Sequence, residues 1–122
     1  MINTGIKEVR TSELNELLDQ KGVVLADFYA SWCPPCRAMT PIVEQLAARF
    51  AGQANVVKVD VDRANELAST YGVRSIPTFL LFANGQVVER VVGTTTEAAL
   101  VGMIESHLGQ LGWAELELTP RK

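Results

Sequence analysis

Residues 23–36 read Val-Val-Leu-Ala-Asp-Phe-Tyr-Ala-Ser-Trp-Cys-Pro-Pro-Cys, an apolar run that leads directly into a pair of cysteines. The run from Val23 to Ala30 is almost uninterrupted, which is typical of a strand covered on both faces. Beyond the cysteines, apolar residues from Met39 to Phe50 recur at helical spacing. A Cys-x-x-Cys pair beside a βαβ pattern indicates a dithiol that opens and closes as a disulfide. We therefore expect redox chemistry at Cys33 and Cys36.

Other roles suit these two cysteines poorly. A bridge between such close neighbours constrains the unfolded chain very little, and two cysteines cannot form a disulfide framework. A structural zinc site needs about four cysteine or histidine ligands. The single histidine, His107, lies far along the chain on an expected C-terminal helix. We expect no metal site and no cofactor, since the chain has no glycine pattern typical of dinucleotide binding.

The composition is that of an ordinary globular domain. The 122 residues suit one domain, and the net charge of -3 comes from interspersed acidic and basic residues. This argues against a nucleic-acid or membrane surface, which needs clustered Lys and Arg. No segment has the apolar length of a membrane span, and Met1 to Glu8 lacks that of a secretory signal. We expect a cytoplasmic monomer with protein partners, although a secreted protein stripped of its signal would have the same pattern.

Strand and helix patterns alternate along the chain without repeats or an internal linker. The expected strands cover residues 6–9, 23–30, 56–61, 79–83 and 86–92. The expected helices begin at a Thr11 or Ser12 cap, after Cys36, at Ala64, and near Thr94 to Thr96. Asn84-Gly85, between two apolar runs, is a strong hairpin signal. The order βαβαβαββα predicts an α/β fold in which a central mixed sheet is flanked by helices on both faces.

Four segments resemble the thioredoxin family in order and spacing. They are Ala26 to Cys36, Lys58 to Asp62, Tyr71 to Thr78, and Phe82 to Gly85 with Gly93 after the hairpin. The resemblance covers about Val9 to Leu108 and implies a thioredoxin fold with a Cys-Pro-Pro-Cys active site. It implies a single domain over residues 1–108 and a C-terminal extension over residues 109–122.

The resemblance also implies that Cys33 lies at the amino end of a long helix. Unpaired backbone N–H groups and the helix dipole favour a thiolate there, and the thiolate is the nucleophile in disulfide exchange. We expect Cys33 to be the exposed nucleophile and Cys36, one helical turn further on, to be the more buried resolving thiol. Attack by Cys33 would give a mixed disulfide, which Cys36 then breaks, leaving the target reduced.

Asp27 stands in the middle of the apolar run and would lose much of its hydration there. Such burial raises the pKa of a carboxyl group toward neutral, where it is a useful proton acceptor. We expect Asp27 to accept the proton of Cys36, and the resemblance places Lys58 beside it. As alternatives, Asp27 is paired with a lysine for stability, and Lys58 is a solvated charge at a strand end.

The substrate-binding surface is expected around the cysteines. Trp32 would be exposed there as a flat contact surface, with burial in the core as the alternative. The resemblance implies a cis peptide between Ile76 and Pro77, whose preceding backbone groups would pair with an extended substrate. Val73 and Gly93 would complete the rim of this surface.

The chain departs from the family pattern at Pro34, Tyr29 and Ser75, where glycine, tryptophan and glycine respectively are common. Pro34, which we also assign to the substrate-binding surface, has the largest consequence. Two successive prolines stiffen the turn and remove two N–H groups that could face the Cys33 sulfur. These two effects act on different redox states, so the sequence does not give the sign of the change in potential.

The segment beyond Leu108 is apolar for a chain end. Glu115 to Leu118 alternates like an edge strand, and the apolar residues of the segment are Leu111, Trp113, Leu116 and Leu118. Docking of this segment and a frayed terminus are both open interpretations.

Together these features favour a thioredoxin-type protein-disulfide reductase. Its substrates would be disulfide-containing proteins, and its electron donor would be an NADPH-dependent thioredoxin reductase. A disulfide oxidase or isomerase, and a redox-indifferent binding module of the same fold, are the alternatives. Serine at both cysteines separates an enzyme from a binding module, and the redox potential separates a reductase from an oxidase.

Overall fold

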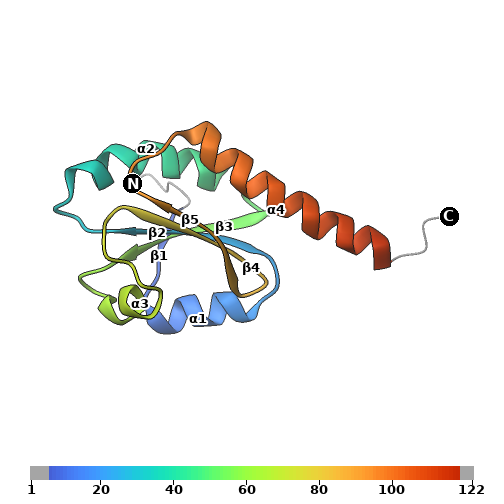
Figure 1. Cartoon of the computed structure of the whole chain (residues 1–122), viewed down its shortest axis with the longest axis horizontal. Coiled ribbons are helices and arrows are strands. Elements are labelled where there is room, and N and C mark those ends of the chain that lie inside the picture. Colours follow the sequence, from blue (N-terminus) through green and yellow to red (C-terminus); the bar gives the residue numbers. More distant parts are fainter. Residues whose placement is uncertain (1–5, 119–122) are drawn as a thin grey trace.

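The computed structural model describes the backbone of residues 6–118 and the side chains of residues 6–108 (Figure 1). The elements follow the predicted order βαβαβαββα. The strands are β1 (Lys7–Glu8), β2 (Val23–Tyr29), β3 (Ala54–Asp60), β4 (Thr78–Ala83) and β5 (Gln86–Val92). The helices are α1 (Thr11–Asp19), α2 (Pro34–Arg49), α3 (Asn65–Thr70) and α4 (Glu97–Leu118).

The five strands form one mixed sheet in the order β1-β3-β2-β4-β5. β1 and β2 both run parallel to β3, whereas β4 runs antiparallel to β2 and to β5. The predicted hairpin between β4 and β5 is confirmed, because Asn84 and Gly85 have φ angles of 52° and 87°. Two successive positive φ angles are those of a type I′ turn, whose twist matches that of the flanking strands. β2 is central in the sheet: it pairs with β3 along its whole length and with β4 from Val23 to Phe28.

Each face of the sheet has its own apolar core, as the predicted fold class requires. α1 and α3 cover one face, and α2 and α4 cover the other (Figure 1). Side chains of β2 alternate between the two cores: Val24, Ala26 and Phe28 face α1 and α3, whereas Val23 and Leu25 face α2 and α4. The same alternation places Asp27 and Tyr29 on the face covered by α2 and α4.

Two local predictions are wrong. α1 is not capped by Thr11 or Ser12, because both lie inside the helix; instead the backbone N–H of Arg10 donates to the Glu13 carboxylate at 3.0 Å. The strand predicted for Glu115 to Leu118 is part of α4, which continues unbroken across the predicted domain boundary at Leu108.

The continuation of α4 has a simple cause. Each added residue gains one backbone hydrogen bond at little further cost, and the interior glycines each reduce helix stability by only about 1 kcal/mol. The first proline of the segment is Pro120, after the helix has ended. The predicted docking of the apolar side chains beyond Leu108 lies outside the described side chains.

β5 forms one edge of the sheet and is exposed along most of its length. Val88 is 40% exposed. The two charged residues in the middle of the strand have partners on other elements: the Glu89 carboxylate lies 3.1 Å from His107 Nε2, and Arg90 Nη2 donates to the Tyr71 carbonyl at 2.5 Å.

Among the helices within residues 6–118, none combines the length and the apolar character needed to cross a membrane.

Candidate active site

Cys33 occupies the N-cap position of α2, where the helix leaves four backbone N–H groups without intrahelical partners. Pro34 and Pro35 fill the first two helical positions and have no N–H to donate. The N–H of Cys36 is therefore the first donor of the helix, and it points at the Cys33 sulfur with an N···S distance of 3.2 Å. The implied position of Cys33 at the helix amino end is confirmed.

Cys33 and Cys36 are joined by a disulfide bond, so the structure represents the oxidised form. The expectation that Cys33 is exposed and Cys36 more buried is wrong for this form, since their exposed fractions are 4% and 3%. The closed bridge places the two sulfur atoms against each other, and both cysteines pack in one small apolar cluster with Ala30 and Ile76.

The chain entering β4 closes the other side of the cysteines. The Ile76–Pro77 peptide is cis, as the resemblance implied. The Cys33 sulfur lies 4.0 Å from the carbonyl oxygen of Ile76. Gly93 joins this group by donating its N–H to the Pro77 carbonyl at 2.8 Å, and its φ of 94° is one that few other residues adopt. A Cβ at Gly93 would meet no atom within 4 Å, so the surface beside Pro77 is open.

Trp32 is 63% exposed, which confirms the predicted exposure of its ring and contradicts the alternative of core packing. Its indole N–H donates to the Asp62 carboxylate at 2.8 Å. Pro34 is exposed on the same turn. An exposed aromatic ring held by a hydrogen bond beside a reactive sulfur is suited to contact another protein.

Asp27 is the buried ionisable group of this site. Only 2% of the residue is exposed, and its Oδ1 has no hydrogen-bond partner among the described residues. Burial raises its pKa from 3.8 to about 7, while the positive charge of Lys58 lowers it in part. The predicted rise of this pKa toward neutral is confirmed.

Lys58 lies opposite Asp27 in the register of β3 and β2. Within residues 6–108 its ammonium forms no ion pair, so the stabilising Asp-Lys pair considered above is not formed. Instead its Nζ lies 4.2 Å from the centre of the Tyr29 ring. Both side chains line a pocket of about 290 Å³ that also reaches Cys36.

Comparisons with known proteins agree with this geometry. The family model described as Thioredoxin matches residues 5–106. The chain belongs to the thioredoxin family.

Two members of the thioredoxin family illustrate the similarity in sequence. Thioredoxin 1 of Nostoc sp. is 45% identical over 93 residues, which are 76% of this chain and 87% of that protein. A thioredoxin of Staphylococcus aureus is 43% identical over 89 residues, which are 73% of this chain and 86% of that protein.

A solved structure is similar as well. A single-residue mutant of a thioredoxin from Halobacterium salinarum superposes with a TM-score of 0.80 at 45% identity, covering 88% of this chain and 96% of that one. With the disulfide-bonded Cys-x-x-Cys pair, these similarities identify a thiol-disulfide oxidoreductase that acts as a protein-disulfide reductase. As in the rest of the thioredoxin family, its partners are disulfide-containing proteins and a reductase.

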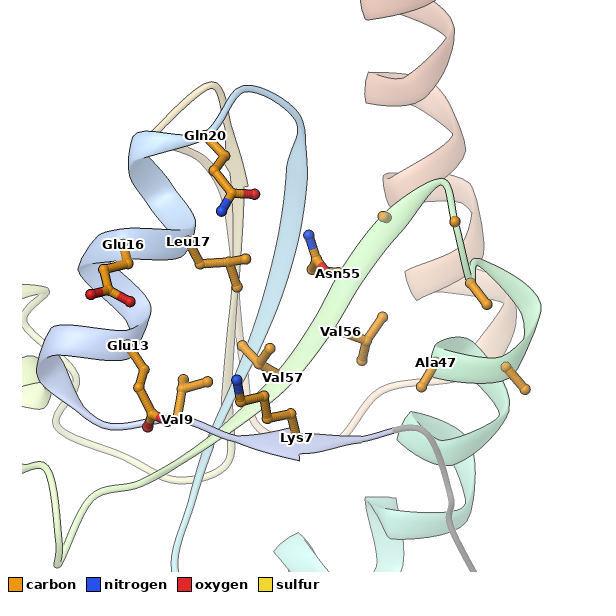
Figure 2. A pocket seen from close by; sticks show the side chains of 14 residues that line it. Lys7, Val9, Glu13, Glu16, Leu17, Gln20, Ala47, Asn55, Val56 and Val57 are labelled. Carbon is orange, nitrogen blue, oxygen red and sulfur yellow. The ribbon is translucent and has the colours of Figure 1, made fainter.

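A second pocket lies away from this thioredoxin-family site. Figure 2 shows it between α1, the end of α2 and the start of β3, with a volume of about 620 Å³. Lys7, Glu13 and Val56 are among its lining residues, and neither cysteine is. β2 and β3 run away from this pocket toward the cysteines, at the strand ends where open α/β sheets bind their ligands.

The structure places one predicted residue outside the cysteine cluster and adds other residues to the site. Val73 packs against the core under α1 and α3 rather than in the cluster of the two cysteines. Sequence reasoning missed Asp62, the partner of Trp32, and Glu8, which accepts a hydrogen bond from the Tyr29 hydroxyl at 2.8 Å. The acidic residues that follow β3 were the only signal for Asp62, and nothing in the sequence connected Glu8 with Tyr29.

Proposed function

We propose that this protein reduces disulfides through its Cys-Pro-Pro-Cys pair, with Cys33 as the nucleophile and Cys36 as the resolving thiol. The observation that carries the proposal is the Cys33 sulfur at the N-cap of α2, facing the N–H of Cys36 at 3.2 Å. The partial positive charge of the helix end stabilises a thiolate at that position in the reduced form.

The exchange takes two steps. The Cys33 thiolate attacks one sulfur of the substrate disulfide, forming a mixed disulfide and releasing the other sulfur as a thiolate. The Cys36 thiolate then attacks the Cys33 sulfur and releases the second substrate thiolate. Two electrons pass to the substrate, and the Cys33–Cys36 disulfide is formed.

The second step requires that Cys36 lose a proton, and we assign Asp27 as the acceptor. A pKa of about 7 leaves Asp27 partly ionised at neutral pH and able to take up a proton there. Lys58 assists by keeping that pKa from rising further, since its charge favours the ionised form.

We assign the substrate-binding surface to the exposed ring of Trp32 and to the chain beside the Cys33 sulfur. The Ile76 carbonyl, 4.0 Å from that sulfur, is placed to receive a backbone N–H from an extended substrate. The residues assigned to this surface are Trp32, Pro34, Val73, Ile76, Pro77 and Gly93.

The oxidised pair must be reduced again by two electrons, and we propose an NADPH-dependent thioredoxin reductase as the donor. We further propose that the protein is a cytoplasmic monomer, with one catalytic domain over residues 1–108 and an extension over residues 109–122.

Single-cysteine variants test the proposal. With a disulfide-bonded model protein such as insulin, Cys36→Ser is expected to accumulate a mixed disulfide through Cys33, whereas Cys33→Ser is expected to form none. Mass spectrometry of the trapped species identifies the attacking sulfur. Trapping through Cys36 in the Cys33→Ser variant would overturn the assignment of roles.

A second measurement tests the direction of electron flow. Wild-type protein that has been reduced is expected to reduce insulin, and the Cys33→Ser, Cys36→Ser double variant is expected to show no turnover. An equilibrium potential of the pair near that of strong oxidants such as DsbA, about -120 mV, would favour an oxidase instead. Partner binding that survives in the double variant, with no turnover by the wild type, would favour a redox-indifferent binding module.

A further inference from the structure

The ammonium group of Lys58 rests on an aromatic ring rather than on a carboxylate. Its Nζ lies 4.2 Å from the centre of the Tyr29 ring, within the range of about 6 Å in which a cation is attracted to the ring face. Lys58 is half-buried, and such contacts strengthen when they are shielded from water. Tyr29 stands where tryptophan is common in the family, so this chain builds the contact with a phenol.

The Tyr29 ring is itself held in place by residues outside the site. Its hydroxyl donates to Glu8 Oε1 at 2.8 Å, and Glu8 Oε2 lies 3.5 Å from Arg63 Nη1. Arg63 in turn lies 3.8 Å from the Asp60 carboxylate at the end of β3. Burial and the Glu8 hydrogen bond raise the pKa of Tyr29 above its ordinary value, so its hydroxyl stays protonated and remains a donor.

The contact between Lys58 and the Tyr29 ring bears on whether Asp27 has a charged partner. Asp27 and Lys58 are opposite each other on adjacent parallel strands, and their side chains share one face of the sheet. Within residues 6–108, however, the Lys58 ammonium does not lie within 4.0 Å of any carboxylate oxygen. Asp27 Oδ1 has no hydrogen-bond partner among these residues. Lys58 therefore acts on Asp27 at a distance.

The charged and titratable groups around this pair are few. Lys58 on β3 is the charged group that acts on Asp27, and Phe79 is the partner of Asp27 on β4. α2 contributes Cys36 and the charged Arg37 to the pocket that Lys58 and Tyr29 line. The charged groups around Tyr29 are Glu8 on β1, Lys58 and Asp60 on β3, and Arg63 beyond β3.

We propose that Tyr29 is a positioning residue, whose ring holds the Lys58 ammonium short of an ion pair with Asp27 and so leaves that carboxyl group without a charged contact partner. The importance of this arrangement for turnover rests on the proposed role of Asp27 as the proton acceptor for Cys36. The position of the Lys58 ammonium over the Tyr29 ring does not depend on that role.

The titration of Asp27 in the oxidised protein tests the inference. In Tyr29→Leu the ammonium loses its ring and is free to approach the carboxylate, which favours the ionised form. We expect the pKa of Asp27 to fall from about 7 to about 6, and NMR of its carboxyl carbon measures this change. Tyr29→Phe keeps the ring and is the matched control, with a pKa close to that of the wild type.

A double-mutant cycle separates positioning from a general structural effect. In a Lys58→Met background there is no ammonium to release, so Tyr29→Leu is expected to leave the pKa of Asp27 unchanged. An equal fall in both backgrounds, or no fall in the presence of Lys58, would overturn the inference.

A measurement on the wild type keeps the inference testable if Tyr29→Leu does not fold. Methylene protons next to an ammonium held over a ring face are shifted upfield by the ring current. We expect this shift for the Lys58 ε-protons and its persistence in Tyr29→Phe. Random-coil shifts for these protons would also overturn the inference.

The outcome for catalysis is read separately. If Tyr29→Leu lowers the pKa of Asp27, the pH dependence of mixed-disulfide resolution by Cys36 should move down by the same amount. A moved titration with an unmoved rate profile would remove Asp27 from the proposed mechanism while leaving the positioning by Tyr29 intact.

Discussion

The two faces of the sheet are built from the same strands but differ in what they bury. Among the described residues, the face under α1 and α3 buries no charged side chain, and Val24, Ala26 and Phe28 of β2 are all buried in its core. The face under α2 and α4 begins in the same way with Val23 and Leu25, and then carries Asp27 and Tyr29 toward the disulfide. One face is devoted to stability, whereas the other gives up part of its apolar surface to bury an ionisable group.

Truncation of a side chain in the core under α1 and α3 should have the largest effect on stability. Phe28 is fully buried there, and Phe28→Ala is expected to lower the free energy of unfolding by about 3–5 kcal/mol through lost burial and a residual cavity. The exposed Val88→Ala on β5 is the control, with a change below about 0.5 kcal/mol. Denaturant unfolding measures both changes, and equal losses of unfolding free energy in the two variants would contradict the burial of Phe28 in this core.

Asp27 should have the next largest effect, with the opposite sign. Its pKa is raised from 3.8 to about 7 on folding, so its contribution to stability is full below 3.8 and is lost as the pH rises through 7. The free energy of unfolding of the wild type should therefore include a decline of about 3 kcal/mol between about pH 5 and pH 8. Asp27→Asn should lack this decline.

Asp60 is the matched control for this prediction. It is also buried, but its carboxylate accepts a hydrogen bond from the Asp62 N–H at 2.9 Å. Asp60→Ala should lower the free energy of unfolding by about 1–2 kcal/mol, because the partly buried hydrogen bond from the Asp62 N–H is lost. At about pH 8 Asp27→Asn should be more stable than the wild type, and a less stable variant there would contradict the unpartnered state of Asp27.

Trp32 should have the smallest effect on stability and a clear effect on substrate. Because the residue is 63% exposed, Trp32→Ala is expected to change the free energy of unfolding by less than about 0.5 kcal/mol. The loss of an aromatic contact should lower kcat/KM for a protein disulfide about fivefold, mainly through KM. Trp32→Phe keeps most of the ring and loses the Asp62 hydrogen bond, so an equally large loss with this variant would place the effect in the bond rather than the surface.

The strands, most helices and the raised pKa of Asp27 could be predicted because each depends on a short-range pattern. The uninterrupted apolar run around Asp27 is sufficient to indicate burial, and burial is the main cause of its raised pKa. The hairpin at Asn84 and Gly85 likewise depends on two neighbouring residues with positive φ.

The parts that could not be predicted depend on residues that are distant in the sequence. Glu8 and Tyr29 belong to strands that are separated by β3 in the sheet, and no periodic pattern connects them. The burial of Cys33 arises from the closed disulfide and from Ile76, which is 43 residues further along the chain. In α4, an alternating pattern of only four residues was too short to distinguish a strand from the continuation of a helix.

The two charged residues of β5 bear on aggregation at high protein concentration. A bare sheet edge invites strands of other molecules to add to it, and an unbroken apolar edge is the usual starting point of aggregation. Here Glu89 and Arg90 divide the valines of the strand into two short pairs, and each charge is tethered to its own molecule. Any chain that added to this edge would have to accommodate both charges, which disfavours pairing of β5 with a strand of a second molecule.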